Sequence, residues 1–205
     1  MHPNPVFHTA SVAENLAFAR ARSFGVLAVS VAGAAPMLSH VPFLLSEDGE
    51  TVELHLVRSN PIARALSAPL PARLAVNGPD SYVSPDWYGI DDQVPTWNYV
   101  AVHLTGVLEL RPQEELAGVL DRLSDLFEDR LLPKIPWRRA KMDPEVLARL
   151  MRMIVPVRLR IETVEGTWKL GQNKPEAVRL AAAAGIEEAG IGAELAALAG
   201  LMRQQ

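Results

Sequence analysis

Hydrophobic and polar residues alternate in short runs over much of the first half of the chain, after one segment with helical spacing. Ser11 and Glu14 form a capping-box signature, and apolar residues at helical spacing continue towards Ser23, which predicts a first helix over 11–23. Three short runs follow, separated by turn-forming residues that include Asp48-Gly49. They predict strands at 25–31, 37–45 and 51–57.

The middle of the chain combines a helix start, a strand and a loop. Asn60-Pro61 predicts a short helix, because Asn caps helices well and Pro is tolerated at the first helical position. Residues 72–77 predict a strand, and Gly78-Pro79 is expected to end it. The stretch 84–98 carries two prolines and three aromatic residues, which predicts a packed loop.

The clearest strand pattern covers 99–110. Val100, Val102 and Leu104 share one face of this strand, and the residues between them share the other. Because this alternation is long and regular, it predicts a strand that is buried on one side.

Helices predominate after that strand, with one further strand among them. Apolar stripes at helical spacing predict helices over 112–127 and 144–153. Residues 157–162 alternate between apolar and charged side chains, which predicts a final strand with one solvated face. Another helix is expected from 175 onward, and the Ala-rich tail 187–202 is expected to be helical too.

These elements favour an α+β fold. About six or seven short strands, with helices inserted between the late ones, indicate a mainly antiparallel sheet or small barrel rather than a series of βαβ units. We expect one main domain over 1–180, with inserted helices at about 112–153, and a C-terminal helical tail over 181–205.

Composition narrows the class of protein further. The 205 residues are 49% hydrophobic and 21% charged, which is the balance of a soluble domain with a sizeable core. A formal charge of -4 disfavours a broad contact with nucleic acid, and the absence of cysteine excludes disulfides and Cys-based sites. The five histidines lack close ligand spacing, so no metal site is expected. Without a long apolar run or a signal-peptide pattern, the protein is expected to be cytoplasmic and free of membrane contact.

Two early segments place polar side chains where a ligand would find donors. Ser39 and His40 interrupt an apolar strand, although a single histidine there is also typical of a hydrogen-bonded structural residue. Arg58, Ser59 and Asn60 connect a strand to a helix start, whose N–H groups and guanidinium suit a phosphate. The alternative is that Asn60 only caps the helix and that Arg58 is solvated.

Two later segments suit a flat ring or an anion. Trp97, Asn98 and Tyr99 offer aromatic faces for stacking and an amide for a ring edge, although Trp97 is equally suited to anchoring the core. The segment 169–175 offers two ammonium groups and two amides where a strand leads into a helix start. A ring-edge carbonyl or an anion would bind there, and a capped turn without a ligand is the alternative.

One basic segment is the candidate for a contact with nucleic acid. No acidic residue lies between Arg130 and Asp143, and the cations between them are Lys134, Arg138, Arg139 and Lys141, with Trp137 in the same stretch. Because the molecule as a whole is negatively charged, a solvated basic face is the competing interpretation.

The order of these segments resembles the PaiB family of FMN-binding negative transcriptional regulators. The family pattern is Ser-His-x-Pro-Phe, Arg-x-Asn-Pro, Gly-Pro-x-x-Tyr-Val-Ser-Pro-x-Trp-Tyr, Val-Pro-Thr-Trp-Asn-Tyr-x-x-Val-His and Lys-Leu-Ser-Gln-Asn-Lys. The corresponding segments here are 39–43, 58–61, 78–88, 94–103 and 169–174. The third and fourth are long and specific, and the resemblance covers roughly 1–180.

The resemblance implies a six- or seven-stranded split β-barrel that binds FMN, a homodimer with flavin near the subunit interface, and a role in transcriptional repression. Carried over by position, the flavin-site candidates are Ser39, His40, His55, Arg58, Ser59, Asn60, Trp97, Asn98, Tyr99, Gln172, Asn173 and Lys174. From their chemistry, we expect the phosphate at Arg58, Ser59 and Lys174. We expect the isoalloxazine at Trp97, Asn98, Gln172 and Asn173.

One departure from the family pattern bears on the site. Gly171 stands where the pattern has Ser, which removes a hydroxyl donor and loosens the local backbone, so a lower affinity for flavin is expected. Two alternatives to the regulator stay open. One is an FMN-dependent oxidoreductase that uses the same pocket, with a proton supplied by His40, Tyr99 or His103. The other is a related split barrel that binds a different flat ligand, or none.

Overall fold

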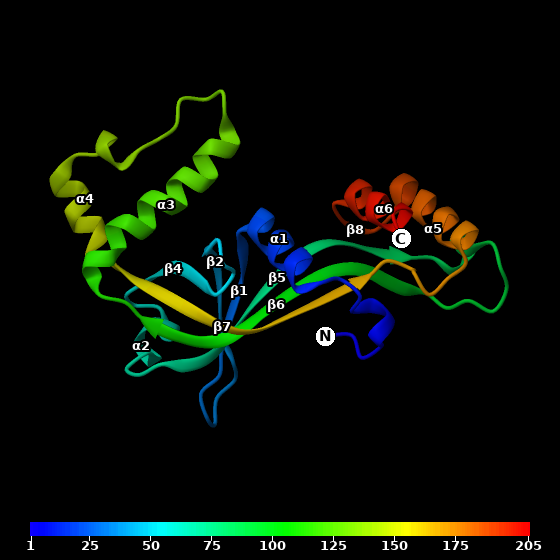
Figure 1. Cartoon of the computed structure of the whole chain (residues 1–205), viewed down its shortest axis with the longest axis horizontal. Coiled ribbons are helices and arrows are strands. Elements are labelled where there is room, and N and C mark those ends of the chain that lie inside the picture. The colour runs from blue at the N-terminus through cyan, green and yellow to red at the C-terminus, as the bar shows by residue number, and fades with distance from the viewer. The chain divides into compact units, whose positions relative to one another are not determined.

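The computed structural model describes residues 1–205 and divides them into two compact units. Unit 1 consists of Met1–Asn15, Val76–Val102 and Glu165–Gln205, and unit 2 of Leu16–Ala75 and His103–Val164. Three long strands contribute residues to both units: β5 (Leu70–Val83), β6 (Thr96–Leu110) and β7 (Ile154–Lys169) (Figure 1).

The strands form one sheet, which confirms the expected antiparallel α+β class. Seven of them follow the order β2-β1-β5-β6-β7-β4-β3, and β8 pairs with β5 in addition. The remaining strands are β1 (Phe24–Val29), β2 (Met37–Pro42), β3 (Leu44–Leu45), β4 (Thr51–Val57) and β8 (Gly192–Ala193). In the β4–β7 pair, His55 lies opposite Pro156 and Leu54 opposite Val157.

Helices flank the sheet. They are η1 (Pro5–Phe7), α1 (Val12–Arg22), α2 (Pro61–Ala65), η2 (Pro85–Tyr88), η3 (Gln113–Glu115), α3 (Leu116–Glu128), η4 (Asp129–Leu131), η5 (Arg139–Lys141), α4 (Pro144–Met151), α5 (Glu176–Ala189) and α6 (Leu195–Arg203). The capping box of α1 is present, since the Ser11 N–H donates to Glu14 Oε2 at 2.7 Å and the Glu14 N–H donates to Ser11 Oγ at 3.2 Å. No helix has the length and apolar character needed to span a membrane.

Each unit has its own set of buried side chains. In unit 2, alternate residues of the strands fill the interior, and Leu27, Leu74 and Leu104 are fully buried. In unit 1, α5 and α6 pack side by side (Figure 1) through small and apolar residues such as Ala182 and Leu198. The sequence pattern of 99–110 is confirmed, because Val100, Val102 and Leu104 are buried while the intervening residues are half-buried.

Strand β5 continues through Gly78-Pro79, where the sequence predicted its end. It pairs with β1 only between Ala72 and Ala75, and with β8 only at Asp80 and Ser81. Because Pro79 lies between these two pairings, its missing N–H interrupts neither of them. A proline can therefore stand within a long strand at a point where that edge carries no partner.

Three other boundaries differ from the prediction. Strand β6 begins at Thr96 instead of 99, so part of the predicted loop is strand, and β7 covers Ile154–Lys169 instead of 157–162. The Ala-rich tail is not one helix, because Gly190 and Gly192 interrupt it between α5 and α6. Glycine is a weak helix former, and the interruption supplies β8 as a partner for β5.

Close packing of β6 against β7 generates a prediction on stability. A Cβ added at Gly106 would lie 1.9 Å from the carbonyl oxygen of Arg160, whereas one at Gly200 in α6 would meet nothing within 4 Å. We expect Gly106→Ala to lower the free energy of unfolding by about 2 kcal/mol or more, because the strands must separate. We expect Gly200→Ala to raise it by about 0.5 to 1 kcal/mol, because alanine favours the helix.

Urea denaturation of the two variants beside the unchanged protein measures both effects. A Gly106→Ala variant as stable as the unchanged protein would show that β6 and β7 do not approach this closely.

Candidate functional site

Two aromatic flavin-site candidates line a hollow on unit 1. Trp97, Tyr99 and Ala101 lie on the same face of β6 and line a cavity of about 330 Å³, together with Asn77 and Asp80 of β5. Trp97 is 46% exposed, which is unusual for so large an apolar side chain. Trp97 therefore does not anchor the core, which was the alternative left open by the sequence.

Asn98 points away from that hollow. Successive residues of a strand project to opposite faces, so Asn98 lies on the face opposite Trp97 and Tyr99. It is 1% exposed, and its Nδ2 donates to Met202 Sδ of α6 at 3.5 Å. A ring that rests on Trp97 therefore cannot contact the Asn98 amide from the same side of the strand.

In the segment after β7, the side-chain amide of Gln172 forms hydrogen bonds within its own turn. Gln172 Nε2 donates to the Trp168 carbonyl at 2.6 Å, and Gln172 Oε1 accepts from the Leu170 N–H at 2.8 Å. Asn173 is exposed. Lys174 Nζ donates to Gln93 Oε1 and lies 5.0 Å from the centre of the Tyr88 ring. Of the three predicted residues in this segment, only Asn173 makes no such contact through its side chain.

Gly171 adopts a backbone conformation that suits glycine. Its φ is +80°, in the left-handed region, and a Cβ there would lie 3.4 Å from Arg179 Cγ and 3.7 Å from Asn98 Nδ2. The position therefore faces the interior of unit 1. The turn is held by both polar atoms of the Gln172 side-chain amide. It is also held by the Lys174 N–H, which donates to the Gly171 carbonyl at 2.9 Å.

Lys169 is the half-buried cation at the start of the predicted segment 169–175, although it is not among the flavin-site candidates. Its Nζ donates to Thr96 Oγ1 and lies 5.8 Å from the centre of the Phe7 ring. Burial lowers the pKa of the Lys169 ammonium group.

In unit 2, the predicted residues next to α2 form one connected group. Asn60 caps α2 through its Oδ1, which accepts from the Ile62 N–H at 2.9 Å, and its Nδ2 donates to Ser39 Oγ at 3.2 Å. Arg58 is not merely solvated: its Nε donates to the Arg152 carbonyl at 3.1 Å, and its Nη2 donates to the Gln113 side chain at 3.0 Å. The structure thus brings Ser39 and Asn60 together.

The side chains of the other predicted residues of unit 2 make no hydrogen bond with that pair. Ser59 and His40 are exposed, and His40 projects from β2 on the face opposite Ser39. His55 lies on β4 and lines a separate cavity of about 280 Å³ under α3, with Phe127 and Trp137. Its Nδ1 is buried without a hydrogen-bond partner, and burial lowers the pKa of its imidazole.

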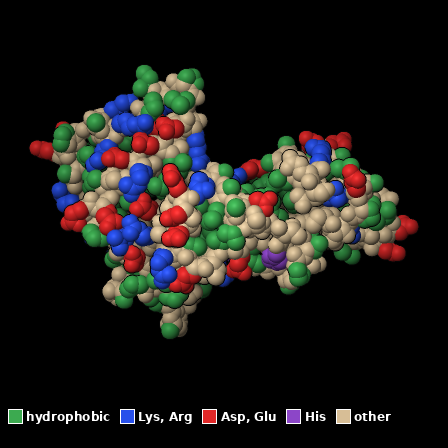
Figure 2. Space-filling view, in the orientation of Figure 1, with side chains coloured by type: hydrophobic (Ala, Val, Ile, Leu, Met, Phe, Trp, Pro, Cys, Tyr) green, Lys and Arg blue, Asp and Glu red, His purple; other side chains and the backbone are tan.

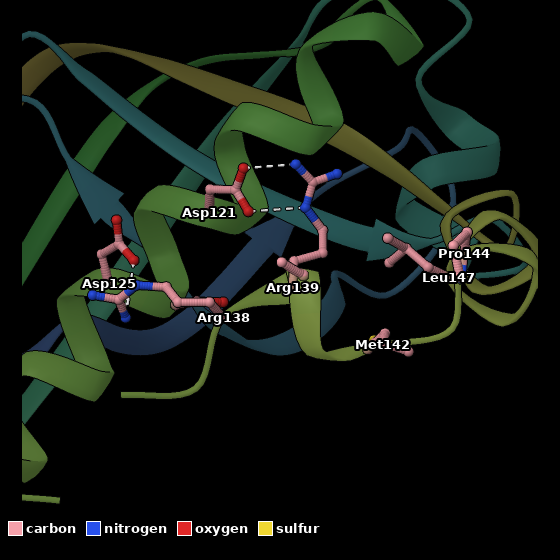
Figure 3. Close-up of a pocket in the computed structure, with 9 residues that line it drawn as sticks. Asp121, Asp125, Arg138, Arg139, Met142, Pro144 and Leu147 are labelled. Atoms are coloured by element: carbon pink, nitrogen blue, oxygen red, sulfur yellow. Dashed lines mark hydrogen bonds and ion pairs between the residues drawn. The ribbon is translucent and has the colours of Figure 1, made fainter. Parts of the chain in front are cut away.

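The basic segment predicted for nucleic acid is largely neutralised. Arg139 forms a two-point ion pair with Asp121 at 2.9 and 2.7 Å, and Arg138 pairs with Asp125 at 3.2 Å (Figure 3). Lys134 pairs with Glu128, while Arg130 and Lys141 donate to backbone carbonyls. Lys and Arg side chains also lie among Asp and Glu on the visible surface of α3 and α4 (Figure 2). The cations therefore tie loops to α3, and a cavity of about 530 Å³ between these pairs has balanced charge.

Comparison with known proteins decides the family. Residues 1–163 match the family described as "Putative FMN-binding domain". The chain belongs to this family. FMN is accordingly the cofactor, as expected from the sequence. The chain is 30% identical to Protease synthase and sporulation protein PAI 2 of Bacillus subtilis over 161 residues, which are 78% of this chain and 76% of that protein. This similarity confirms the resemblance to the PaiB family.

Solved structures confirm the split-barrel fold of the family. The flavocytochrome Anf3 from Azotobacter vinelandii matches with a TM-score of 0.60 at 16% identity, over 82% of this chain and 72% of that chain. The FAD and heme binding protein from Mycobacterium smegmatis matches with a TM-score of 0.56 at 18% identity, over 80% of this chain and 73% of that chain. At these identities the likeness concerns the fold alone.

The hollow of unit 1 fits the planar part of the FMN molecule. Its volume of about 330 Å³ suits a small ligand, and Trp97 and Tyr99 supply aromatic surface for stacking beside the amide of Asn77. The carboxylate of Asp80 at the same hollow disfavours a phosphate there. A phosphate group is therefore not expected in this hollow.

The lowered pKa of His55 generates a prediction on pH dependence. A His in the unfolded chain has a pKa of about 6.5, and burial lowers the pKa of His55 in the folded protein. Below about pH 6.5 the unfolded chain therefore binds a proton more readily than the folded protein does. We therefore expect the free energy of unfolding to fall as the pH drops from about 7.5 to about 5.5. His55→Phe removes the titrating group, so the variant should lose less stability over the same interval.

Urea midpoints of both proteins at the two pH values give the comparison. Equal losses in the unchanged protein and the variant would show that His55 titrates normally.

Proposed function

We propose that the protein is an FMN-binding regulator of the PaiB type, and that it represses transcription without using the segment 130–141 as its DNA-binding surface. Membership of the FMN-binding family supports the cofactor. The observation that carries the proposal is the half-exposed Trp97 beside Tyr99, because large aromatic faces left open on a strand are suited to stacking on a flat ring.

In this proposal, the hollow of unit 1 binds the isoalloxazine. Trp97 offers its indole face, and Asn77 offers an amide at the ring edge. When bound, FMN would accept and return electrons, and the protein's task is to orient the ring and limit access of water. In unit 2, taken by itself, Ser59 is exposed and Arg58 makes no hydrogen bond through its Nη1, so both keep donors available to an anion.

The proposed assembly is a cytoplasmic homodimer. Unit 1 leaves large apolar side chains in solvent, with Val94 at 73% exposure and Ile191 at 65%, in addition to Trp97. Exposed apolar side chains of this size support a surface that a second copy would cover. The family resemblance supports the same arrangement, in which flavin lies near the interface.

An FMN-dependent oxidoreductase is the alternative, and one observation favours it. Tyr99 lines the same hollow as Trp97, which supports Tyr99 as the proton donor in this alternative. Of the other two candidates, His40 is exposed on β2 and His103 is half-buried on β6, and neither lines this hollow. Turnover of NADPH by the FMN-loaded protein is the property that separates this alternative from the regulator.

The role of Trp97 leads to a prediction on flavin affinity. We expect Trp97→Ala to weaken FMN binding at least about fivefold, because stacking on one aromatic face contributes about 1 to 3 kcal/mol. Trp97→Phe keeps an aromatic face and should bind within about threefold of the unchanged protein. Titration of FMN with each protein, followed by quenching of flavin fluorescence, measures the three dissociation constants.

Trp97→Ala with unchanged FMN affinity would place the ring elsewhere and contradict the proposed site. An unchanged protein that does not quench FMN at micromolar concentrations would contradict the proposed function itself.

The ion pairs of the basic segment lead to a prediction on DNA binding. Arg138 and Arg139 already face Asp125 and Asp121, so few counterions would be released from them on a phosphate backbone. We expect the double variant Arg138→Ala/Arg139→Ala to bind promoter DNA with the same salt dependence as the unchanged protein. Binding measured at several salt concentrations by fluorescence anisotropy tests this.

A clearly shallower salt dependence of the double variant would make the segment a phosphate contact after all. The expected loss for these substitutions is in stability, since α3 loses its ties to the loop that follows it.

A further inference from the structure

Unit 2 contains a cavity that the proposed flavin hollow does not use. It has a volume of about 280 Å³ and lies between the outer face of β4 and helix α3. Its walls are mainly apolar, with Leu120, Leu123 and Phe127 from α3 and Trp137 from the following loop. The polar residues that line it are His55 of β4 and Ser124 and Glu128 of α3. A cavity of this size accepts a molecule with one or two rings, below the range of about 300 to 1,000 Å³ for drug-sized ligands.

His55 has hydrogen-bonding capacity that the protein leaves unused. Its Nδ1 is buried and has no hydrogen-bond partner. Burial lowers the pKa of the imidazole, so the ring is neutral near neutral pH and carries one proton. With the proton on Nδ1, this buried N–H has no acceptor in the protein, and an acceptor oxygen on a bound molecule would remove that cost. The ring then offers an N–H donor that no protein acceptor engages.

The aromatic wall of this cavity is held in place by Glu128. The Glu128 carboxylate accepts from the Trp137 N–H at 2.7 Å and from Lys134 Nζ, so the loop after α3 folds back over the helix. The hydrogen bond from Lys134 lowers the pKa of Glu128, which keeps the carboxylate ionised. The cavity is therefore bounded by Trp137, whose backbone is held by Glu128, and no Lys or Arg lines it to offset the cost of burying an anion.

We propose that the cavity between β4 and α3 is a second ligand site, which takes a small, uncharged aromatic molecule with one oxygen that accepts a hydrogen bond from His55. The apolar walls select the ring, His55 selects the acceptor, and the lack of a lining cation disfavours carboxylates and phosphates. A phosphorylated flavin does not meet these conditions, so this ligand differs in class from FMN. In a flavin-dependent regulator, such a site would receive the effector.

Three planar probes of nine non-hydrogen atoms separate these contributions. Acetophenone carries the neutral acceptor, α-methylstyrene replaces the oxygen by a methylene group, and benzoate adds a charge. We expect acetophenone to bind at millimolar concentration and α-methylstyrene to bind at least fivefold more weakly, the worth of about one hydrogen bond. Benzoate should not bind. Ligand-detected NMR on the full chain measures the three affinities.

Two variants and one control locate the binding. His55→Phe keeps a ring but removes the N–H, so the preference for acetophenone over α-methylstyrene should disappear. Leu120→Trp fills the cavity and should abolish binding of both probes. Leu150→Trp makes the same substitution at a 44% exposed position of α4 and should change nothing. Circular dichroism of each variant establishes that it is folded.

The proposal is overturned if acetophenone fails to bind, if it binds equally well to Leu120→Trp, or if His55→Phe keeps the preference. Repeating the titration in protein saturated with FMN distinguishes this site from the flavin site. Unchanged acetophenone affinity supports two sites, and mutual exclusion would assign the cavity to the flavin and overturn the second site. FMN binding without acetophenone binding would leave the proposed function intact and refute only this inference.

Discussion

The alternation of side chains along β6 is the constraint on which the proposed flavin site depends. A strand sends consecutive residues to opposite faces, so Trp97, Tyr99 and Ala101 must share one side of the sheet while Asn98 and Val100 share the other. The buried face holds unit 1 together, with Asn98 against Met202 of α6. The other face is thereby left with aromatic groups that the chain covers only in part, since Trp97 is 46% exposed and has the edge of the Tyr82 ring beside it. Stability and ligand binding thus use the two sides of one strand.

Charge in this protein holds chain segments together and leaves little net field. Carboxylates of α3 form ion pairs with Arg139, Arg138 and Lys134. Arg58 donates hydrogen bonds to the Arg152 carbonyl and to the Gln113 side chain. Exposed pairs of this kind contribute little to stability one by one, but they fix where the loop after α3 runs. That loop closes the cavity beside His55, where the imidazole is neutral because water is kept away. The same ion pairs therefore disfavour a DNA-binding surface and build the wall of a small-molecule site.

Much of the fold followed from local patterns, and the errors have identifiable causes. The cap of α1, the strand β4 and the two faces of β6 depend on neighbours in sequence and were predicted correctly. The passage of β5 through Pro79 depends on where β1 and β8 stop pairing, which is a long-range property. Neutralisation of Arg138 and Arg139 likewise depends on α3, whose Asp121 and Asp125 lie outside the basic segment. A window of sequence shows a run of cations, but only the fold shows which acids meet them.

The candidate residues divide by chemistry in a way that the family pattern does not reveal. The amides of Asn60, Gln172 and Asn98 are engaged with groups of their own chain: a helix end and Ser39, a turn, and the sulfur of Met202. The rings of Trp97 and Tyr99 are not held by hydrogen bonds of this kind, because an aromatic face forms no conventional hydrogen bond and needs only an open surface. A sequence pattern rich in Asn and Gln can therefore identify a flavin-binding fold even though most of these amides form hydrogen bonds within the protein. Affinity for the ring would then depend on the aromatic pair more than on the amides that made the pattern recognisable.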